Sequence, residues 1–216
     1  MFKKSVIGLM LVGLIFLVAA CGEENQGTPT ASTGFDVATF EFPNPELPVV
    51  LIDIEGYGII IAELYPDYAP ITVHNFIDLV ESGFYDGLGF HRIIEGFMMQ
   101  GGCPYGMGIG GSGRHIVGEF SDNGIENVLR HHRGVLSMAR AMDYDSASSQ
   151  FFIMHDNSPH LDGGYAGFGR VIYGIEVVDA IVDNAEPVDR NGTIEPENHP
   201  IMNEIRLING AQIQLD

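Results

Sequence analysis

Short runs of β-branched, aromatic and other apolar residues dominate the chain from residue 48 onward. Two runs within 49–64 flank a turn that contains Gly56 and Gly58, and this pattern predicts a β-hairpin. Six further runs have the length and composition of strands: FHRII (90–94), FMMQG (97–101), GVLSMAR (134–140), SQFFIMH (149–155), GFGRVI (167–172) and MNEIRLI (202–208). The pattern therefore predicts about eight strands.

Two segments show the helical period instead. In 69–83, Pro70 suits the first turn of a helix and Gly83 can end it. Apolar residues recur there three and four positions apart, at Val73, Phe76, Ile77 and Val80. In 174–185 the corresponding residues are Ile175, Val178, Ile181 and Val182. A parallel sheet needs a helix for each crossover, so this pattern predicts a mainly antiparallel barrel or sandwich with helical caps.

The first twenty residues differ in character from the rest of the chain. Lys3 and Lys4 precede the apolar run SVIGLMLVGLIFLVAA, and Cys21 follows it. This order is typical of an export signal peptide. The ending LVAAC resembles the lipobox of bacterial lipoproteins, which implies cleavage before Cys21 and lipid attachment to that cysteine. An uncleaved membrane helix is the alternative, but the run is shorter than the roughly 20 residues that span a bilayer.

Residues 21–46 are rich in Gly, Thr, Pro and acidic residues and lack a sustained period. We interpret them as a flexible acidic tether between the lipid and a domain that occupies 47–216. A strand within 35–42 is the alternative, because FDVATFEF alternates.

Acidic residues outnumber basic ones by 29 to 10, and the net charge is −19. A surface of this sign repels nucleic-acid phosphates and anionic lipid headgroups, which argues against nucleic acid as a ligand. Attachment to a membrane would therefore depend on the lipid, and neutral or basic polypeptides are the expected partners.

A phosphate-binding loop, a metal site and a catalytic nucleophile are each suggested by individual residues, but the surrounding sequence does not support any of them. The glycine-rich stretch 106–113 has no following lysine and no strand-to-helix frame, so it predicts a loop with positive φ angles and no phosphate site. His131 and His132 belong to no zinc-binding motif, and no metal is expected. Cys103 has no activating partner nearby in sequence, and the serines of 145–150 lack a nucleophile elbow.

Five motifs in order along the chain carry a family resemblance: FHRIIEGFMMQGG, GVLSMARA, SSQFFIMH, LDGGYAGFGRV and GIEVVDAI. Together they closely resemble the cyclophilin family of peptidyl-prolyl cis/trans isomerases over roughly residues 48–210. The resemblance implies a closed eight-stranded antiparallel β-barrel capped by two α-helices, which acts on X-Pro bonds of polypeptides without a cofactor. We expect a monomer.

The same resemblance assigns the site by position. Arg92 is similar to the family's catalytic arginine, and Gln100, beside it in the pattern, is assigned to the catalytic site with it. The implied substrate groove and proline pocket consist of Phe97, Met98, Ala139, Ala141, Gln150, Phe152 and Leu161. His91, next to Arg92, is expected to be a hydrogen-bonded structural histidine, because rotation about an amide needs no proton transfer.

Three groove positions depart from the common eukaryotic pattern. Arg140 replaces an asparagine, which puts a substrate hydrogen bond in doubt and adds a second cation. His160 replaces a tryptophan that helps the family hold cyclosporin, so weak cyclosporin binding is expected. Tyr165 replaces a histidine and should preserve an aromatic wall.

The sequence therefore predicts an isomerase that assists the folding of exported proteins, lipid-anchored outside the cytoplasm. Two alternatives remain at this point. The groove could hold proline-containing peptides as a chaperone or scaffold with little turnover, or the barrel could be a structural spacer of the cell envelope.

Overall fold

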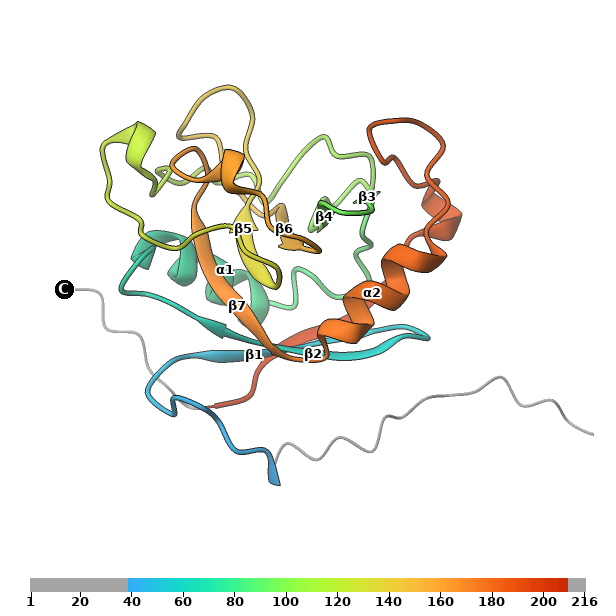
Figure 1. The fold of residues 1–216 in the computed structure, drawn as a ribbon, viewed down its shortest axis with the longest axis horizontal. Helices are drawn as coiled ribbons and strands as arrows, with labels where there is room; N and C mark the ends of the chain where they lie inside the picture. The colour runs from blue at the N-terminus through green and yellow to red at the C-terminus, as the bar shows by residue number, and fades with distance from the viewer. Residues whose placement is uncertain (1–38, 210–216) are drawn as a thin grey trace, which may run out of the picture. The chain divides into compact units, whose positions relative to one another are not determined.

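A computed structural model of the chain describes residues 39–209 (Figure 1). The strands are β1 (Val49–Ile54), β2 (Gly58–Leu64), β3 (Arg92–Ile94), β4 (Met98–Gly101), β5 (Val135–Met138), β6 (Phe151–Met154), β7 (Gly167–Tyr173) and β8 (Met202–Leu207). The α-helices are α1 (Pro70–Glu81) and α2 (Ile175–Asn184), and short 3-10 helices are η2 (Ser121–Asn123), η3 (Pro159–Leu161) and η4 (Pro196–Asn198). The eight predicted strands and both predicted helices are confirmed.

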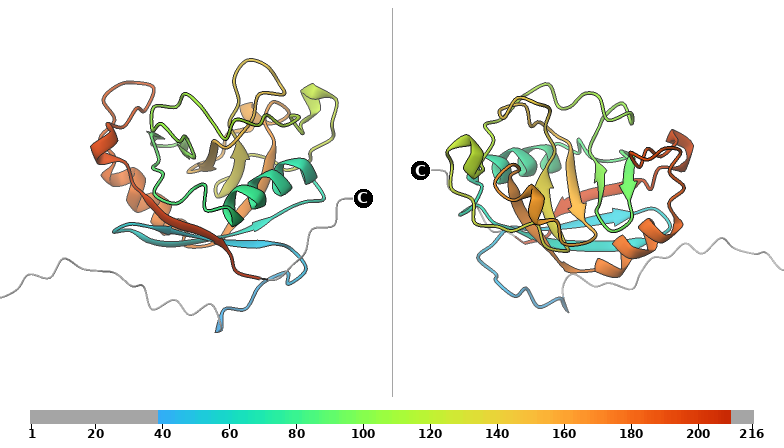
Figure 2. Two further views of the ribbon diagram at one scale, coloured as in Figure 1. Left: turned by 180° about the vertical axis from the view of Figure 1, so that it is seen from behind. Right: turned by 45° about the horizontal axis from the view of Figure 1, so that its top comes forward.

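All eight strands form one antiparallel sheet in the order β3-β4-β6-β5-β7-β2-β1-β8. The sheet curls strongly (Figures 1 and 2), and residues just before its two end strands lie side by side. They meet through an isolated bridge between Gly89 and Ile201, beside the hydrogen bond from Met202 N to Leu88 O at 2.9 Å. The predicted closed barrel is thus a curled half-barrel, in which the described end strands β3 and β8 are not paired with each other.

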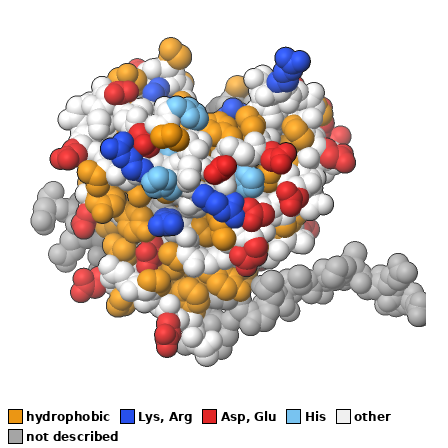
Figure 3. All heavy atoms as spheres, viewed as in Figure 1, with side chains coloured by type: hydrophobic (Ala, Val, Ile, Leu, Met, Phe, Trp, Pro, Cys, Tyr) orange, Lys and Arg blue, Asp and Glu red, His pale blue; other side chains and the backbone are white. Residues whose placement is uncertain are grey.

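The main core fills the inside of the curled sheet, under a surface that in Figure 3 mixes acidic, basic and apolar side chains. Alternate strand residues such as Ile52, Leu136 and Ile153 are buried there, as period-two alternation requires. Phe76 of α1 joins them, with its ring centroid 5.3 Å from that of Phe151 and 5.0 Å from that of Phe168. Helix α1 packs against β8 and α2 against β2, well apart from each other in Figure 2.

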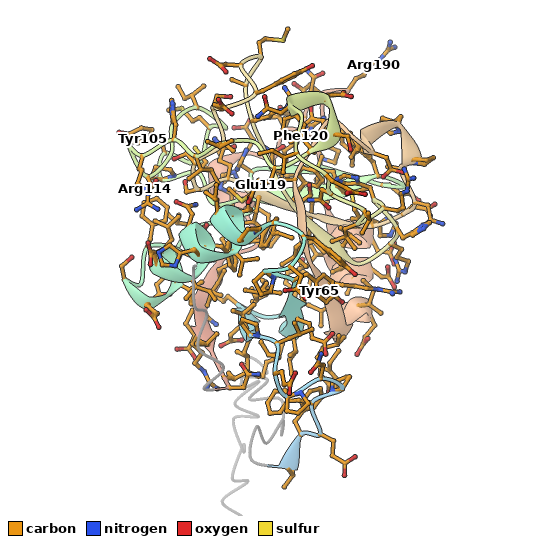
Figure 4. The ribbon with its side chains drawn as sticks, turned by 90° about the vertical axis from the view of Figure 1, so that its left-hand side faces the viewer. Tyr65, Tyr105, Arg114, Glu119, Phe120 and Arg190 are labelled. Carbon is orange, nitrogen blue, oxygen red and sulfur yellow. The ribbon has the colours of Figure 1, made fainter. Side chains whose placement is uncertain are left out.

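Helix α1 begins at Pro70, as predicted, but its N-cap Ala69 has no side chain that can cap it. Glu119, distant in sequence, supplies the cap. Its carboxylate accepts hydrogen bonds from the backbone N–H of Ile71 at 3.0 Å and of Thr72 at 2.7 Å, and from the Thr72 hydroxyl at 2.6 Å. Glu119 is only 2% exposed, in the middle of the view in Figure 4. Its charge therefore lies next to the positive end of the α1 dipole.

The described part of the expected tether, 39–46, contains no strand, so the alternative of a strand within 35–42 is not supported over 39–42. The rings of Phe40 and Tyr173 lie 6.0 Å apart, and Asn44 N donates to a Glu63 carboxylate oxygen at 3.2 Å. This stretch therefore contacts the domain. The signal-peptide prediction for 1–20, Cys21 and most of the tether lie outside the described residues. None of the helices in the described part of the chain has the length and hydrophobicity of a membrane span.

Candidate active site

A small pocket of about 130 Å³ opens on the outer side of β3, β4 and β6. It is lined by Arg92, Phe97, Met98, Gln100, Ala139, Arg140, Phe152, Leu161 and Tyr165. All of these were predicted from the sequence. The structure thus brings together one end of the predicted groove with the predicted proline pocket.

The apolar walls of this pocket arise from strand alternation. On β6, Phe151 points into the main core, whereas Phe152 belongs to a second apolar cluster with Met98 and Leu161. The adjacent phenylalanines therefore serve opposite faces of one strand. A one-residue slip of β6 would exchange them and destroy both faces.

Arg92 lies at the polar edge of the pocket, on the end strand β3. Its Nε donates to the carbonyl of Asn191 at 2.7 Å, and its Nη1 donates to Gln100 Oε1 at 3.3 Å. No ion pair of Arg92 is found among residues 39–209, and its Nη2 has no hydrogen-bond partner among them. Burial lowers the pKa of the guanidinium, while Tyr165 and Asp189 act in the opposite direction. It remains a cation at any physiological pH.

Hydrogen bonds continue from Arg92 to the glycine-rich loop. Gln100 Nε2 donates to Gln150 Oε1 at 2.9 Å, and Gln150 Nε2 donates to the carbonyls of Gly108 and Gly110 at 2.9 and 2.8 Å. The predicted positive φ angles of this loop are confirmed, at +72° for Gly108 and +106° for Gly110. The carbonyls of this loop therefore orient Gln150, which in turn orients Gln100.

A larger cavity of about 630 Å³ lies beside the first and shares Gln100, Ala139 and Arg140 with it. Ala141 and Gln150, two predicted groove residues, line this second cavity only. Its other wall includes Tyr105, Ile109, His115, Ser146 and Ser148, which the sequence analysis did not select. Tyr105 lies on the outer side of the loop in Figure 4. The glycines of 106–113 marked this loop, but nothing in their pattern indicated a cavity.

Arg140 lines both cavities and is held by aromatic rings and backbone carbonyls. Its guanidinium carbon lies 4.6 Å from the ring centroid of Tyr165, 4.9 Å from that of Tyr144 and 5.2 Å from that of Phe120. Its Nε and Nη1 also donate to the carbonyls of Gly164 and Ala141, each at 2.9 Å. The predicted second cation is therefore present near the groove, stabilised by cation–π contacts.

The other two departures from the eukaryotic pattern are Tyr165, in the wall of the smaller pocket, and His160, outside it. Tyr165 meets the Phe152 ring edge-on, with centroids 5.9 Å apart, and forms the aromatic wall that was predicted. His160 does not line the pocket. It is exposed, with its ring centroid 5.6 Å from that of Phe97.

Behind Phe152 lies a buried hydrogen-bonded group that no sequence pattern indicated. His131 Nε2 lies 2.9 Å from the Ser137 hydroxyl and its Nδ1 3.0 Å from an Asp162 carboxylate oxygen, while the His131 ring stacks on that of Phe152. Burial lowers the pKa of His131, against the opposing effect of Asp162. Ser137 is fully buried. The group therefore supports the pocket wall and cannot reach a substrate.

His91 was predicted to be hydrogen-bonded, and this was wrong for its ring. The residue is only 5% exposed, yet neither ring nitrogen has a hydrogen-bond partner among the described residues. The ring instead packs close to Gly108. Burial, with a smaller effect of His199 and Arg92, lowers its pKa to about 4, so the ring is neutral and packs like an apolar group.

Cys103 is buried, and its thiol lies 3.2 Å from the carbonyl of Ile109. An inert thiol in this position agrees with the sequence-based interpretation.

Comparison with known proteins identifies the class that this half-barrel and pocket define. The family model described as "Cyclophilin type peptidyl-prolyl cis-trans isomerase/CLD" matches residues 49–206. Peptidyl-prolyl cis-trans isomerase B of Bacillus subtilis is 52% identical over 114 residues, covering 53% of this chain and 76% of that protein. A peptidyl-prolyl cis-trans isomerase of Helicobacter pylori is 46% identical over 126 residues, covering 57% and 74%.

Solved structures agree. A cyclophilin-type isomerase of Cryptosporidium parvum, crystallised in the presence of the dipeptide Ala-Pro, gives a TM-score of 0.64 at 34% identity, covering 74% of this chain and 98% of that one. A cyclophilin of Hirschia baltica gives 0.61 at 26% identity, covering 75% and 74%. The chain belongs to the cyclophilin family, and its activity is the cis/trans isomerisation of peptidyl-prolyl bonds.

Proposed function

We propose that Arg92 is the catalytic residue of this isomerase and donates a hydrogen bond to the prolyl nitrogen as the X-Pro bond twists. Resonance gives the amide bond a rotational barrier of about 18–20 kcal/mol. When the bond twists, the nitrogen becomes pyramidal and regains a lone pair that accepts a hydrogen bond. This interaction is stronger in the transition state than in the planar ground state, which is the condition for raising the rate.

The state of the Arg92 side chain carries this proposal. Its Nε and Nη1 are held by Asn191 and Gln100, so the guanidinium has a fixed direction at the pocket edge. Nη2 has no partner within residues 39–209 and is available to a ligand. A twisted X-Pro bond needs a hydrogen-bond donor for its nitrogen and an apolar site for its ring. Arg92, with one unused donor beside an apolar pocket, supports both.

The remaining groove residues would hold the substrate. Phe97, Met98, Phe152 and Leu161 offer an apolar socket for the proline ring, which leaves the preceding carbonyl free to rotate. Gln100 fixes the guanidinium and faces both cavities, so that it can also steady the substrate backbone. The Ala-Pro dipeptide used with the Cryptosporidium parvum relative supports proline-containing peptides as the ligand class.

Exchange NMR on a short Ala-Pro peptide tests the role of Arg92. Removing one transition-state donor typically costs about 10²–10³ in rate, so we expect Arg92→Ala to lower kcat by roughly that factor while the chain stays folded. Arg206→Ala is the matched control, because Arg206 is exposed on β8 and lines neither cavity. Arg92→Ala with the wild-type rate would reject the proposal. A wild-type chain that binds the peptide without accelerating exchange would favour the chaperone alternative.

We further propose that the enzyme is anchored by lipid on Cys21 and assists the folding of exported proteins outside the cytoplasm. Residues 1–20 run from two lysines through an apolar segment to small residues, and this order supports the proposal. Because X-Pro bonds interconvert over tens of seconds, newly exported chains would benefit from a catalyst at the membrane. Mass spectrometry of the mature N-terminus should find a lipid-modified Cys21, and Cys21→Ser should release the protein from membranes. An unmodified N-terminus at Met1 would contradict the anchor.

A further inference from the structure

The turn at 188–193 is hydrogen-bonded to the Arg92 side chain through one backbone atom. The carbonyl oxygen of Asn191 accepts the hydrogen bond from Arg92 Nε at 2.7 Å. The chain that follows Asn191 pairs with the residues on either side of Arg92, because Ile93 N donates to the carbonyl of Gly192 at 2.8 Å and Ile194 N donates to that of His91 at 3.0 Å. The direction of the Asn191 carbonyl therefore depends on the shape of the turn itself.

Asp189 shapes this turn with three hydrogen bonds. Its Oδ1 accepts from the backbone N–H of Asn191 at 2.9 Å and of Thr193 at 3.1 Å. Its Oδ2 accepts from the Thr193 hydroxyl at 3.0 Å. An aspartate that bonds to backbone N–H groups ahead of it is a strong local turn former. The carboxylate therefore holds the N–H groups on either side of the peptide that carries the Asn191 carbonyl, and the N–H of that peptide, on Gly192, donates to the main-chain carbonyl of Asp189 at 3.2 Å.

We propose that Asp189 is a positioning residue for the isomerase reaction, which sets the direction of the Arg92 guanidinium through the Asn191 carbonyl. The inference rests on the proposed catalytic role of Arg92. Asp189 is exposed and lies outside both cavities, so it acts through Arg92 and does not contact the substrate.

The electrostatics of the turn agree with this arrangement. The hydrogen bonds from Thr193 and Asn191 hold the pKa of the Asp189 carboxyl below its usual value. Because its folded pKa is depressed, the Asp189 carboxyl stays ionised, with both oxygens as acceptors, to a lower pH than an ordinary carboxyl does. At neutral pH the carboxylate also favours the cationic form of Arg92.

Two substitutions separate geometry from charge. Asp189→Ala removes all three side-chain hydrogen bonds, whereas Asp189→Asn keeps one acceptor oxygen for the backbone N–H groups but removes the charge. In the purified full-length chain we expect Asp189→Ala to lower kcat roughly five- to tenfold with little change in KM, as for loss of one orienting hydrogen bond. The kcat of Asp189→Asn should stay within about twofold of the wild-type value. Asp183→Ala, which removes an exposed carboxylate from α2, is the control for net charge.

A spectroscopic signature completes the test. The Nε–H resonance of Arg92 should be protected from exchange in the wild type and in Asp189→Asn, and should shift and lose protection in Asp189→Ala. If Asp189→Ala does not fold, Thr193→Val removes only the Oδ2 hydrogen bond and should shift the same resonance, with about a twofold loss of rate.

The outcomes are distinct. A wild-type rate and an unchanged Arg92 resonance in Asp189→Ala, or in Thr193→Val where that variant is needed, would overturn the inference. An equal loss in Asp189→Asn and Asp189→Ala would also overturn it, because charge and not turn geometry would then be responsible. Arg92→Ala measured alongside identifies failure of the proposed function, since a wild-type rate in that variant would reject the catalytic role itself.

Discussion

The cap that Glu119 places on α1 gives a direct test of what stabilises this fold. Glu119→Gln preserves the side-chain volume but replaces one oxygen by an amide nitrogen that cannot accept a hydrogen bond. The two carboxylate oxygens accept from separate backbone N–H groups, those of Ile71 and Thr72. One of these groups would therefore face another donor at a site that is almost fully buried.

The expected magnitude follows from these contacts. A hydrogen bond to a charged group contributes about 1.5–3 kcal/mol, and a negative charge at a helix N-terminus adds about 0.3–1 kcal/mol. We therefore expect Glu119→Gln to lower the free energy of unfolding by about 2–4 kcal/mol. In a chain of this size that corresponds to a decrease in Tm of roughly 5–15 °C.

Urea unfolding followed by circular dichroism measures this change. Glu126→Gln is the matched control, because Glu126 is exposed and makes no hydrogen bond to the described residues. It should change the free energy of unfolding by less than about 0.5 kcal/mol. If Glu119→Gln behaves like this control, the carboxylate does not stabilise α1 and the reasoning is refuted.

Three further predictions concern residues around the site. The His91 pKa of about 4 lies below its usual 6.5, so the unfolded chain takes up a proton first and stability falls as pH drops from 6.5 toward 4. His91→Phe should reduce the stability difference between pH 7 and pH 5 by roughly 2 kcal/mol in urea unfolding; an unchanged difference would contradict a buried neutral ring. Cyclosporin should bind the wild type weakly and His160→Trp more tightly in calorimetry, and tight wild-type binding would count against this prediction. Gly192→Ala should slow the isomerase, because Gly192 has a φ of +81° and an added Cβ would overlap Ile94; a wild-type rate would show that the turn adapts.

The strand and helix pattern could be predicted because it is local. The alternation that places Phe151 in the core and Phe152 in the pocket can be read along β6, as can the apolar period of α1. The site residues required the resemblance to the cyclophilin family. Residue types alone would have assigned Phe97 and Met98 to the core.

The features that were not predicted depend on contacts between distant parts of the chain. Glu119 lies 47 positions from Thr72, and the Asn191 carbonyl lies 99 positions from Arg92. Nothing near either residue in the sequence indicates its partner. The hydrogen-bond prediction for His91 failed for a related reason, since the polar ring is enclosed by a glycine-rich loop that offers it no acceptor in the described structure.

The weak pairing of the end strand β3 has a consequence for how the enzyme would lose its activity. β3, a strand of only three residues, pairs with β4 on one side and has only an isolated bridge to Thr193 on the other. Strand ends with so few partners open first in native-state fluctuations. A mild rise in temperature or a low concentration of denaturant should therefore abolish catalysis before the sheet unfolds, because the weakly paired strand β3 carries Arg92.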